Sequence, residues 1–142
     1  MPKLILTVGI QGAGKSYYVD HNFVENESLL ITGNDRDPAS ELKRKINKAK
    51  NDKLSIVIDN MHHTLKSRKK RIKEFMDTHS IECHYFYSNN ELSWKRVKER
   101  KTNKISKSKI KDCLISLEPP TLDEGYSRLF FHDESSKIHE IH

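Results

Sequence analysis

Apolar residues along this chain fall into short runs, separated by segments in which apolar positions have a helical spacing. Runs rich in Val, Ile, Leu, Tyr and Phe predict five strands: residues 3–8, 28–32, 54–59, 81–87 and 126–131. Apolar positions recurring every three or four residues predict helices: residues 15–24, 38–50, 64–79, 91–100 and 106–117. This alternation predicts an α/β fold, a three-layer sandwich with a mostly parallel five-stranded sheet. Ligands of such folds bind at the carboxyl ends of the strands.

Length and composition are typical of one globular unit. The 142 residues match the usual size of a domain, so we expect a single domain over 1–142 with a polar tail from about residue 133. No run approaches the roughly 18 apolar residues of a membrane span, and no signal-peptide pattern is present. We therefore expect a cytoplasmic or nuclear protein without a membrane partner. Cys83 and Cys113 are isolated and predict free, buried thiols.

The basic residues are clustered rather than spread evenly. The net charge is +6, with nine basic residues against one acidic residue in 95–111 and six basic residues in 66–73. Clustering of this kind favours a polyanionic partner such as nucleic acid. A solvated lysine-rich surface is the alternative interpretation.

The segment GIQGAGKS, residues 9–16, lies between the first predicted strand and the first predicted helix. It fits G-x-x-x-x-G-K-[ST], in which glycines let backbone N–H groups surround phosphate oxygens, the lysine reaches the β and γ phosphates, and the hydroxyl binds Mg²⁺. A glycine-rich turn without a ligand would not require the Lys-Ser pair at its end. The predicted nucleotide contacts are Gly12, Ala13, Gly14, Lys15, Ser16 and Tyr17.

Three aspartates follow predicted strands. Asp59 ends the apolar run SIVID and is a candidate Mg²⁺ ligand together with Ser16; the alternative is a carboxylate that caps the next loop. Asp35 and Asp37 follow the second strand, where a carboxylate could take the proton of an acceptor hydroxyl. Asp37 directly precedes Pro38 and is the better helix cap, so Asp35 is the preferred base.

Two arginines are spaced to act together. Arg96 and Arg100 lie four residues apart in a predicted helix, so both guanidinium groups are expected on one face. Such a pair can clamp a phosphoryl group, although basic helical faces are commonly only solvated. The other motifs favour a functional role for Arg100.

Taken together, these segments resemble the 5′-kinase domain of polynucleotide kinases, both the phage end-healing enzyme and the kinase half of the animal phosphatase/kinase. The resemblance covers nearly the whole chain and rests on ILTVGIQGAGKS, GND, VIDN, the R-x-x-x-R spacing and EPPTLDEGYSRLFF. It implies the P-loop kinase fold. It also implies that Lys15 and Ser16 hold ATP and Mg²⁺, that Asp35 is the base toward a 5′-hydroxyl, and that Arg100 stabilises the transferring phosphoryl group, with Arg96 beside the nucleotide.

The sequence departs from that family at two places. Pro38 stands where the phage enzyme has an arginine that grips the acceptor phosphate, and Arg36 or the 66–73 cluster could replace it. MHH replaces the Thr-Asn that usually follows Asn60.

The resulting expectation is an ATP-dependent kinase that phosphorylates the 5′-hydroxyl of DNA or RNA. A P-loop kinase of nucleosides, nucleotides or sugars is the first alternative, in which the basic clusters would be incidental. A nucleic-acid-binding P-loop module without turnover is the second, but Lys15 and Asp35 are both present.

Overall fold

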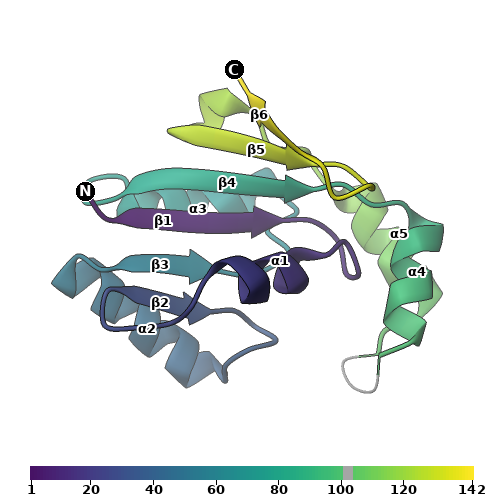
Figure 1. Ribbon diagram of the computed structural model, residues 1–142, viewed down its shortest axis with the longest axis horizontal. Helices are drawn as coiled ribbons and strands as arrows, with labels where there is room; N and C mark the ends of the chain where they lie inside the picture. Colours follow the sequence, from purple (N-terminus) through teal and green to yellow (C-terminus); the bar gives the residue numbers. More distant parts are fainter. Residues whose placement is uncertain (101–103) are drawn as a thin grey trace.

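A single mixed sheet forms the centre of the molecule (Figure 1). The computed structural model describes residues 1–100 and 104–142. The strand order is β2-β3-β1-β4-β5-β6. The strands are β1 (Lys3–Val8), β2 (Leu29–Thr32), β3 (Ser55–Ile58), β4 (Ser80–Phe86), β5 (Arg128–His132) and β6 (Ile138–Ile141). The pairings among β1 to β5 are parallel, and β6 is antiparallel to β5.

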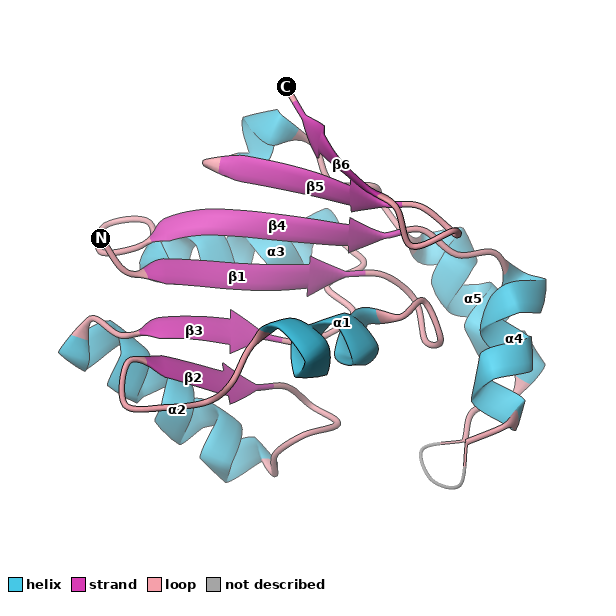
Figure 2. Cartoon of the chain, viewed as in Figure 1, coloured by secondary structure: helices cyan, strands magenta, loops and turns pink. Residues whose placement is uncertain are grey.

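Helices cover both faces of this sheet (Figure 2). One face carries α1, and the opposite face carries α2 and α3, which makes three layers. The remaining two helices, α4 and α5, stand beyond the carboxyl ends of the strands. The helices are α1 (Lys15–Asn22), α2 (Ala39–Asp52), α3 (Leu65–Phe75), α4 (Asn90–Lys98) and α5 (Lys107–Ser116), with a short 3₁₀ turn, η1 (Leu122–Glu124). The fold is the predicted α/β sandwich.

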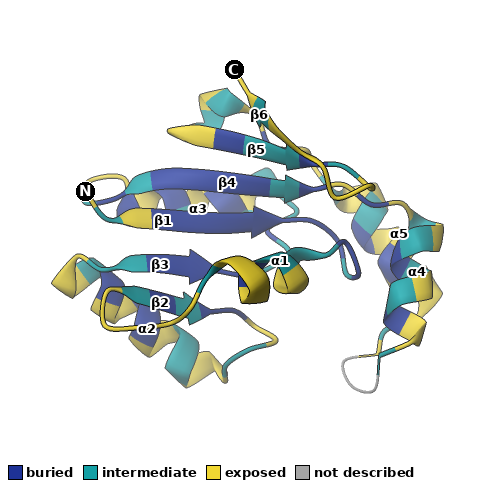
Figure 3. Ribbon diagram, in the orientation of Figure 1, coloured by how far each residue is buried: buried dark blue, intermediate teal, exposed yellow. Residues whose placement is uncertain are grey.

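Strand β1, in the middle of the sheet, is buried on both faces from Leu4 to Val8, which explains its consecutive apolar residues Leu4, Ile5 and Leu6 (Figure 3). On one side, Leu4 and Leu6 are fully buried and join the core beneath α2 and α3. On the other side, Ile5 packs with Val19 of α1 and Val57 of β3. Packing on both faces holds the carboxyl end of β1 rigidly, and the glycine loop starts there.

The sheet has six strands, so the expectation of five was wrong. The sixth strand, β6, comes from the segment expected to be a polar tail, and it pairs Leu129 with Ile141. Arg128 also binds Glu140 with two hydrogen bonds of 2.9 and 2.7 Å. β6 lies at the edge of the sheet and its Ile138 is 45% exposed, so it lacks the apolar run that predicts a buried strand.

Four helices, α1, α3, α4 and α5, are shorter than expected, and one of these differences affects the site. The α4 helix ends at Lys98, so Arg100 lies just past its end and not on the same helical face as Arg96. Lys101, part of the basic stretch, lies outside the described residues. Cys83 and Cys113 are buried and free, as predicted. None of the helices in the described part of the chain combines the length and apolar character needed to cross a bilayer.

Candidate functional site

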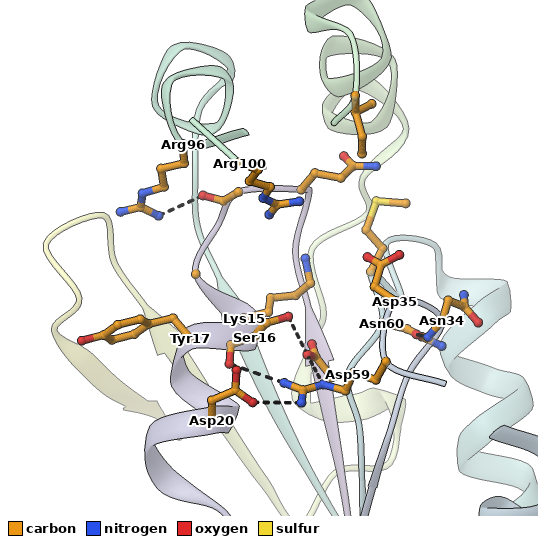
Figure 4. A pocket seen from close by; sticks show the side chains of 16 residues that line it. Lys15, Ser16, Tyr17, Asp20, Asn34, Asp35, Asp59, Asn60, Arg96 and Arg100 are labelled. Carbon is orange, nitrogen blue, oxygen red and sulfur yellow. Dashed lines mark hydrogen bonds and ion pairs between the residues drawn. The ribbon is translucent and has the colours of Figure 1, made fainter. Parts of the chain in front are cut away.

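A cavity of about 700 Å³ opens at the carboxyl edge of the sheet. The glycine loop, the β2–α2 loop, the segment after β3 and the end of α4 surround it (Figure 4). Most of the predicted site residues line this cavity: Gly12, Gly14, Lys15, Ser16, Tyr17, Asp35, Asp59, Arg96 and Arg100. Ala13 is buried and is not among its lining residues. The topology therefore brings together side chains that are up to 88 positions apart in the sequence, from Gly12 to Arg100.

The backbone of the glycine loop requires glycine at position 12. Gly12 has φ 77° and its Cβ position lies 2.7 Å from the carbonyl oxygen of Ser93, so a side chain there would meet both backbone strain and a steric clash. The loop leads into α1, whose first turn has no side-chain cap. Its uncapped N–H groups and positive dipole end favour an anion.

Lys15 is the first residue of α1, and its side chain reaches back to the glycine loop. Its Nζ donates to the carbonyl oxygens of Gly9 at 2.7 Å and Ile10 at 2.9 Å. Burial lowers the pKa of Lys15 to about 8; Asp59 opposes this shift, and the positive charge of Arg100 adds to it. A buried ammonium group whose hydrogen-bond acceptors are neutral carbonyl oxygens is stabilised further when an anion such as polyphosphate lies beside it.

Asp59 accepts three hydrogen bonds at the end of β3. Its Oδ1 accepts from Thr7 Oγ at 3.1 Å, and its Oδ2 accepts from Ser16 Oγ at 2.7 Å and from Arg36 Nε at 2.9 Å. A hydroxyl and a carboxylate oxygen in contact are hard ligands, and Mg²⁺ typically takes only one or two protein oxygens besides phosphate and water. Ser16 and Asp59 therefore fit the predicted metal site chemically. The contact of Thr7 with Asp59 was not predicted, and Arg36, a candidate for the acceptor phosphate, contacts Asp59 instead.

Asp35 lies in the cavity because its loop is docked onto the segment after β3. Asn60 Oδ1 accepts a 2.6 Å hydrogen bond from the backbone N–H of Asn34. A Cβ at Gly33 would clash with the carbonyl of Asp59, so only glycine permits so close an approach. Asn60 therefore positions the neighbour of the candidate base.

Asp37 has a different environment and does not cap α2. Its Oδ2 accepts from Thr32 Oγ at 2.8 Å and pairs with Lys45 Nζ at 3.1 Å, while the N-terminus of α2 has no side-chain cap. Burial alone would raise the pKa of Asp37, but the bonds from Thr32 and Lys45 outweigh it and lower the pKa. The predicted cap is therefore wrong, because a long-range lysine partner holds this carboxylate.

The two arginines lie on the opposite rim from Asp35 and differ in what they contact (Figure 4). Arg96 Nη1 donates to the carbonyl of Gly12 at 2.9 Å and so braces the glycine loop. Arg100 points toward Lys15, and its charge contributes to the lowered pKa of Lys15. Both face the space above the loop, with Arg100 nearer to the lysine.

Arg68, inside the predicted basic stretch 66–73, faces inward. It is fully buried and donates to Glu124 from Nε at 2.7 Å and from Nη2 at 3.1 Å. Its Nη1 also donates to the carbonyl of His62 at 2.8 Å, and Tyr126 OH donates to the same carboxylate at 2.8 Å. The cluster ties the segment after η1 to α3 and to the chain that leaves the cavity. Arg68 is therefore not available to bind nucleic acid.

The sequence matches no protein-family model and no curated protein, but solved structures match the fold. A chain of the Pnkp1/Rnl/Hen1 RNA repair complex aligns with a TM-score of 0.69 at 19% identity, over 82% of this chain and 44% of that one. A fungal RNA kinase aligns with a TM-score of 0.63 at 16% identity, over 92% and 38%. A gluconokinase from Sinorhizobium meliloti aligns with a TM-score of 0.59 at 15% identity, over 96% and 85%.

This chain shares the fold of these three solved structures. Its strands β1 to β5 are parallel, and the cavity lies at their carboxyl edge, where ligands of open α/β sheets bind. The chain spans less than half the length of the matched RNA repair chain and of the fungal RNA kinase. At these identities the likeness concerns the fold, and the chemistry has to be argued from the site.

Proposed function

We propose that this protein is an ATP-dependent phosphotransferase that transfers the γ-phosphoryl group of ATP to the 5′-hydroxyl of DNA or RNA. The observation that carries the proposal is that Lys15 and Asp35 line one cavity above the glycine loop. A lysine that can bind phosphate and a loop carboxylate that can accept a proton, both lining the same cavity, suit transfer to a hydroxyl acceptor.

Each side chain has a defined task in this reaction. The glycine loop and Lys15 hold the β and γ phosphates, while Ser16 and Asp59 would hold Mg²⁺, which neutralises phosphate charge when it is bound. The oxygen of the acceptor hydroxyl bonds to the γ-phosphorus while Asp35 accepts the proton of that hydroxyl. The bond from that phosphorus to the bridging oxygen breaks, and ADP leaves. Arg100 stabilises the charge on the transferring group.

A stripe of lysines on α3 supports a polynucleotide acceptor. These side chains are exposed and recur along one helical face: Lys66, Lys69, Lys70 and Lys73. Within the described part of the chain none of them forms a salt bridge, whereas Lys45 and Lys50 of α2 do. Because α3 begins directly after the segment leaving the cavity, its lysines can contact the backbone phosphates of a strand whose end lies in the cavity.

A small-molecule kinase is the second candidate. The observation in its favour is the match to a gluconokinase, which extends over 96% of this chain and 85% of that one. In that case the acceptor would be a metabolite hydroxyl beside Asp35, and the α3 lysines would be a solvated surface.

Incubation with γ-labelled ATP and two sets of acceptors separates the candidates. One set contains DNA and RNA oligonucleotides with 5′-hydroxyl ends, and the other contains nucleosides, nucleoside monophosphates and gluconate. We expect label on the oligonucleotides, and its loss by several orders of magnitude in a folded Lys15→Ala protein. Label on a small molecule alone would overturn the polynucleotide acceptor, and equal rates with Lys15→Ala would overturn the kinase.

A further inference from the structure

Arg36 follows the candidate base in the chain, but its side chain turns back toward the predicted metal site. Its Nε donates to Asp59 Oδ2 at 2.9 Å, its Nη1 donates to Asp20 Oδ1 at 2.9 Å, and its Nη2 lies 3.4 Å from the carbonyl oxygen of Ser16. The Asp59 side chain is 2% exposed. A carboxylate buried to this degree requires a positive partner, and Arg36 provides it.

The bond from Arg36 uses the oxygen that a metal would need. Asp59 Oδ2 accepts from both Ser16 Oγ and Arg36 Nε, so the two lone pairs of this oxygen are both engaged. Since Ser16 and Asp59 are the residues that fit Mg²⁺, a metal bound to Ser16 Oγ and Asp59 Oδ2 would displace Arg36 from that oxygen. The exchange replaces one cation with another and keeps the carboxylate neutralised.

We propose that Arg36 is a positioning residue that serves as the counter-ion of Asp59 until the metal–nucleotide complex displaces it, and that its release moves the loop carrying Asp35. This inference rests on the proposed function, because it assumes that the cavity binds ATP with Mg²⁺. Arg36 and Asp35 are adjacent, and release of the guanidinium removes the two ion pairs that anchor this loop to Asp20 of α1 and to Asp59 after β3. The position of Asp35 on the acceptor side of the cavity then depends on whether the metal–nucleotide complex is bound.

Asp20 provides a second, milder way to disturb the same contact. It lies one helical turn after Ser16 on α1, is 59% exposed, and holds the outer end of the guanidinium. Removing its charge weakens the restraint on Arg36 without touching the bond to Asp59. Arg44 is a matched control, because it is an exposed arginine whose salt-bridge partner among the described residues is Glu41 on α2.

The test compares the affinity of a non-hydrolysable ATP analogue with and without Mg²⁺, by calorimetry, in the wild type, Arg36→Gln, Asp20→Asn and Arg44→Gln. The measured quantity is the factor by which Mg²⁺ strengthens analogue binding. Arg36→Gln should increase this factor by about ten- to a hundredfold, because a hydrogen bond to a charged group no longer competes for Asp59. Asp20→Asn should increase it less, and Arg44→Gln should leave it unchanged.

Hydrogen exchange tests the link to the loop. The backbone N–H groups of Arg36 and Asp37 both donate to the carbonyl of Gly33. In the wild type they should exchange faster with Mg²⁺ and the analogue bound than without ligand, and in Arg36→Gln they should exchange at one rate in both states. Exchange that is unaffected by ligand in the wild type would overturn the link to Asp35.

The outcomes separate this inference from the proposed function. An Mg²⁺ factor that stays the same or falls in Arg36→Gln overturns the inference; if that variant does not fold, an unchanged factor in Asp20→Asn does so. If the Mg²⁺ factor increases in Arg36→Gln but the wild type phosphorylates no oligonucleotide, the inference is supported and the proposal of a polynucleotide acceptor is overturned. No binding of the analogue in any variant, with or without Mg²⁺, overturns both.

Discussion

Asp35 and Asp37 lie two residues apart in the β2–α2 loop, and their carboxylates face different surroundings. Asp35 lines the cavity with Lys15, while Asp37 is held by Thr32 and Lys45. The same chemical change at the two positions should therefore act on different properties of the protein.

Asp35→Asn should lower kcat by about 10²- to 10⁴-fold, because it removes the proton acceptor and keeps the shape. Its melting temperature and its affinity for ATP with Mg²⁺ should stay close to those of the wild type. Asp37→Asn should instead reduce the free energy of unfolding by about 1 kcal/mol through weaker bonds to Thr32 and Lys45. Rates, calorimetric binding and thermal unfolding are measured together, and a stable, ATP-binding Asp37→Asn protein without activity would make Asp37 the base.

Lys15 should make nucleotide binding depend on pH. Burial lowers its pKa to about 8, so the free protein loses this charge as the pH rises through 8. Polyphosphate favours the charged amine, so binding takes up a proton and weakens by up to about tenfold per pH unit above 8. Titrations of ADP at pH 7, 8 and 9 check this, with Lys15→Met as the control that should be flat over the same range.

A rise in pH changes the contribution of Lys15 to protein stability in the opposite direction to its effect on nucleotide binding. The folded pKa of Lys15 lies below the value of 10.5 expected for an unperturbed lysine, so between about 8 and 10.5 the unfolded chain binds more protons. The contribution of Lys15 to stability therefore rises with pH across this window. Alkaline conditions should weaken binding without destabilising the protein through this residue.

Among the elements, α3 and η1 are joined by the buried pair Arg68 and Glu124. Burial alone would raise the pKa of Glu124, but hydrogen bonds from Arg68 and Tyr126 outweigh it and lower the pKa. The carboxylate therefore contributes stability above its unfolded pKa, and this contribution is lost as the pH falls through the folded value. The pair also fixes the carbonyl of His62 in the segment that follows β3.

Glu124→Gln should reduce the free energy of unfolding by about 3–5 kcal/mol, because it leaves the Arg68 guanidinium buried without its counter-charge. The double variant Arg68→Met, Glu124→Leu should be much less destabilised, since neither side chain then requires a charged partner. Urea unfolding at neutral pH measures both. If the double variant is as unstable as Glu124→Gln, packing rather than charge dominates this contact.

On the scale of the whole molecule, the distribution of the charges matters more than their sum of +6. On α2, Arg44, Lys45 and Lys50 have acidic partners, whereas the four α3 lysines are exposed and form no salt bridge within the described residues. If a polynucleotide strand runs along α3, its affinity should depend on salt through these lysines.

Lys69→Gln with Lys70→Gln should make the slope of log K against log salt for a single-stranded oligonucleotide less negative by about 0.7 per lost contact. Lys43→Gln with Lys48→Gln on α2 is the matched control, with two exposed lysines replaced, and should leave the slope unchanged. Fluorescence anisotropy from low to moderate salt measures it. Equal slopes in the wild type and in both double variants would show that no polynucleotide strand contacts the α3 lysines.

The sequence alone determined the chain order of the five helices and of the first five strands, and the place of the glycine loop. Burial of β1 on both faces requires consecutive apolar residues such as Leu4, Ile5 and Leu6, and helix α2 requires apolar residues on one face, so these local patterns are visible in the sequence. The G-x-x-x-x-G-K-S spacing likewise reflects short-range backbone geometry.

Only the tertiary structure decided which charged residues are buried and what each one binds. Arg68 meets Glu124 across 56 positions and Arg36 meets Asp59 across 23, while the neighbouring Lys69 is exposed. A charged side chain is buried only when a partner compensates its desolvation. In both pairs that partner is far away in the sequence, so the local spacing of residues does not predict it. The same holds for β6, whose place at the sheet edge depends on pairing with β5 rather than on an apolar run of its own.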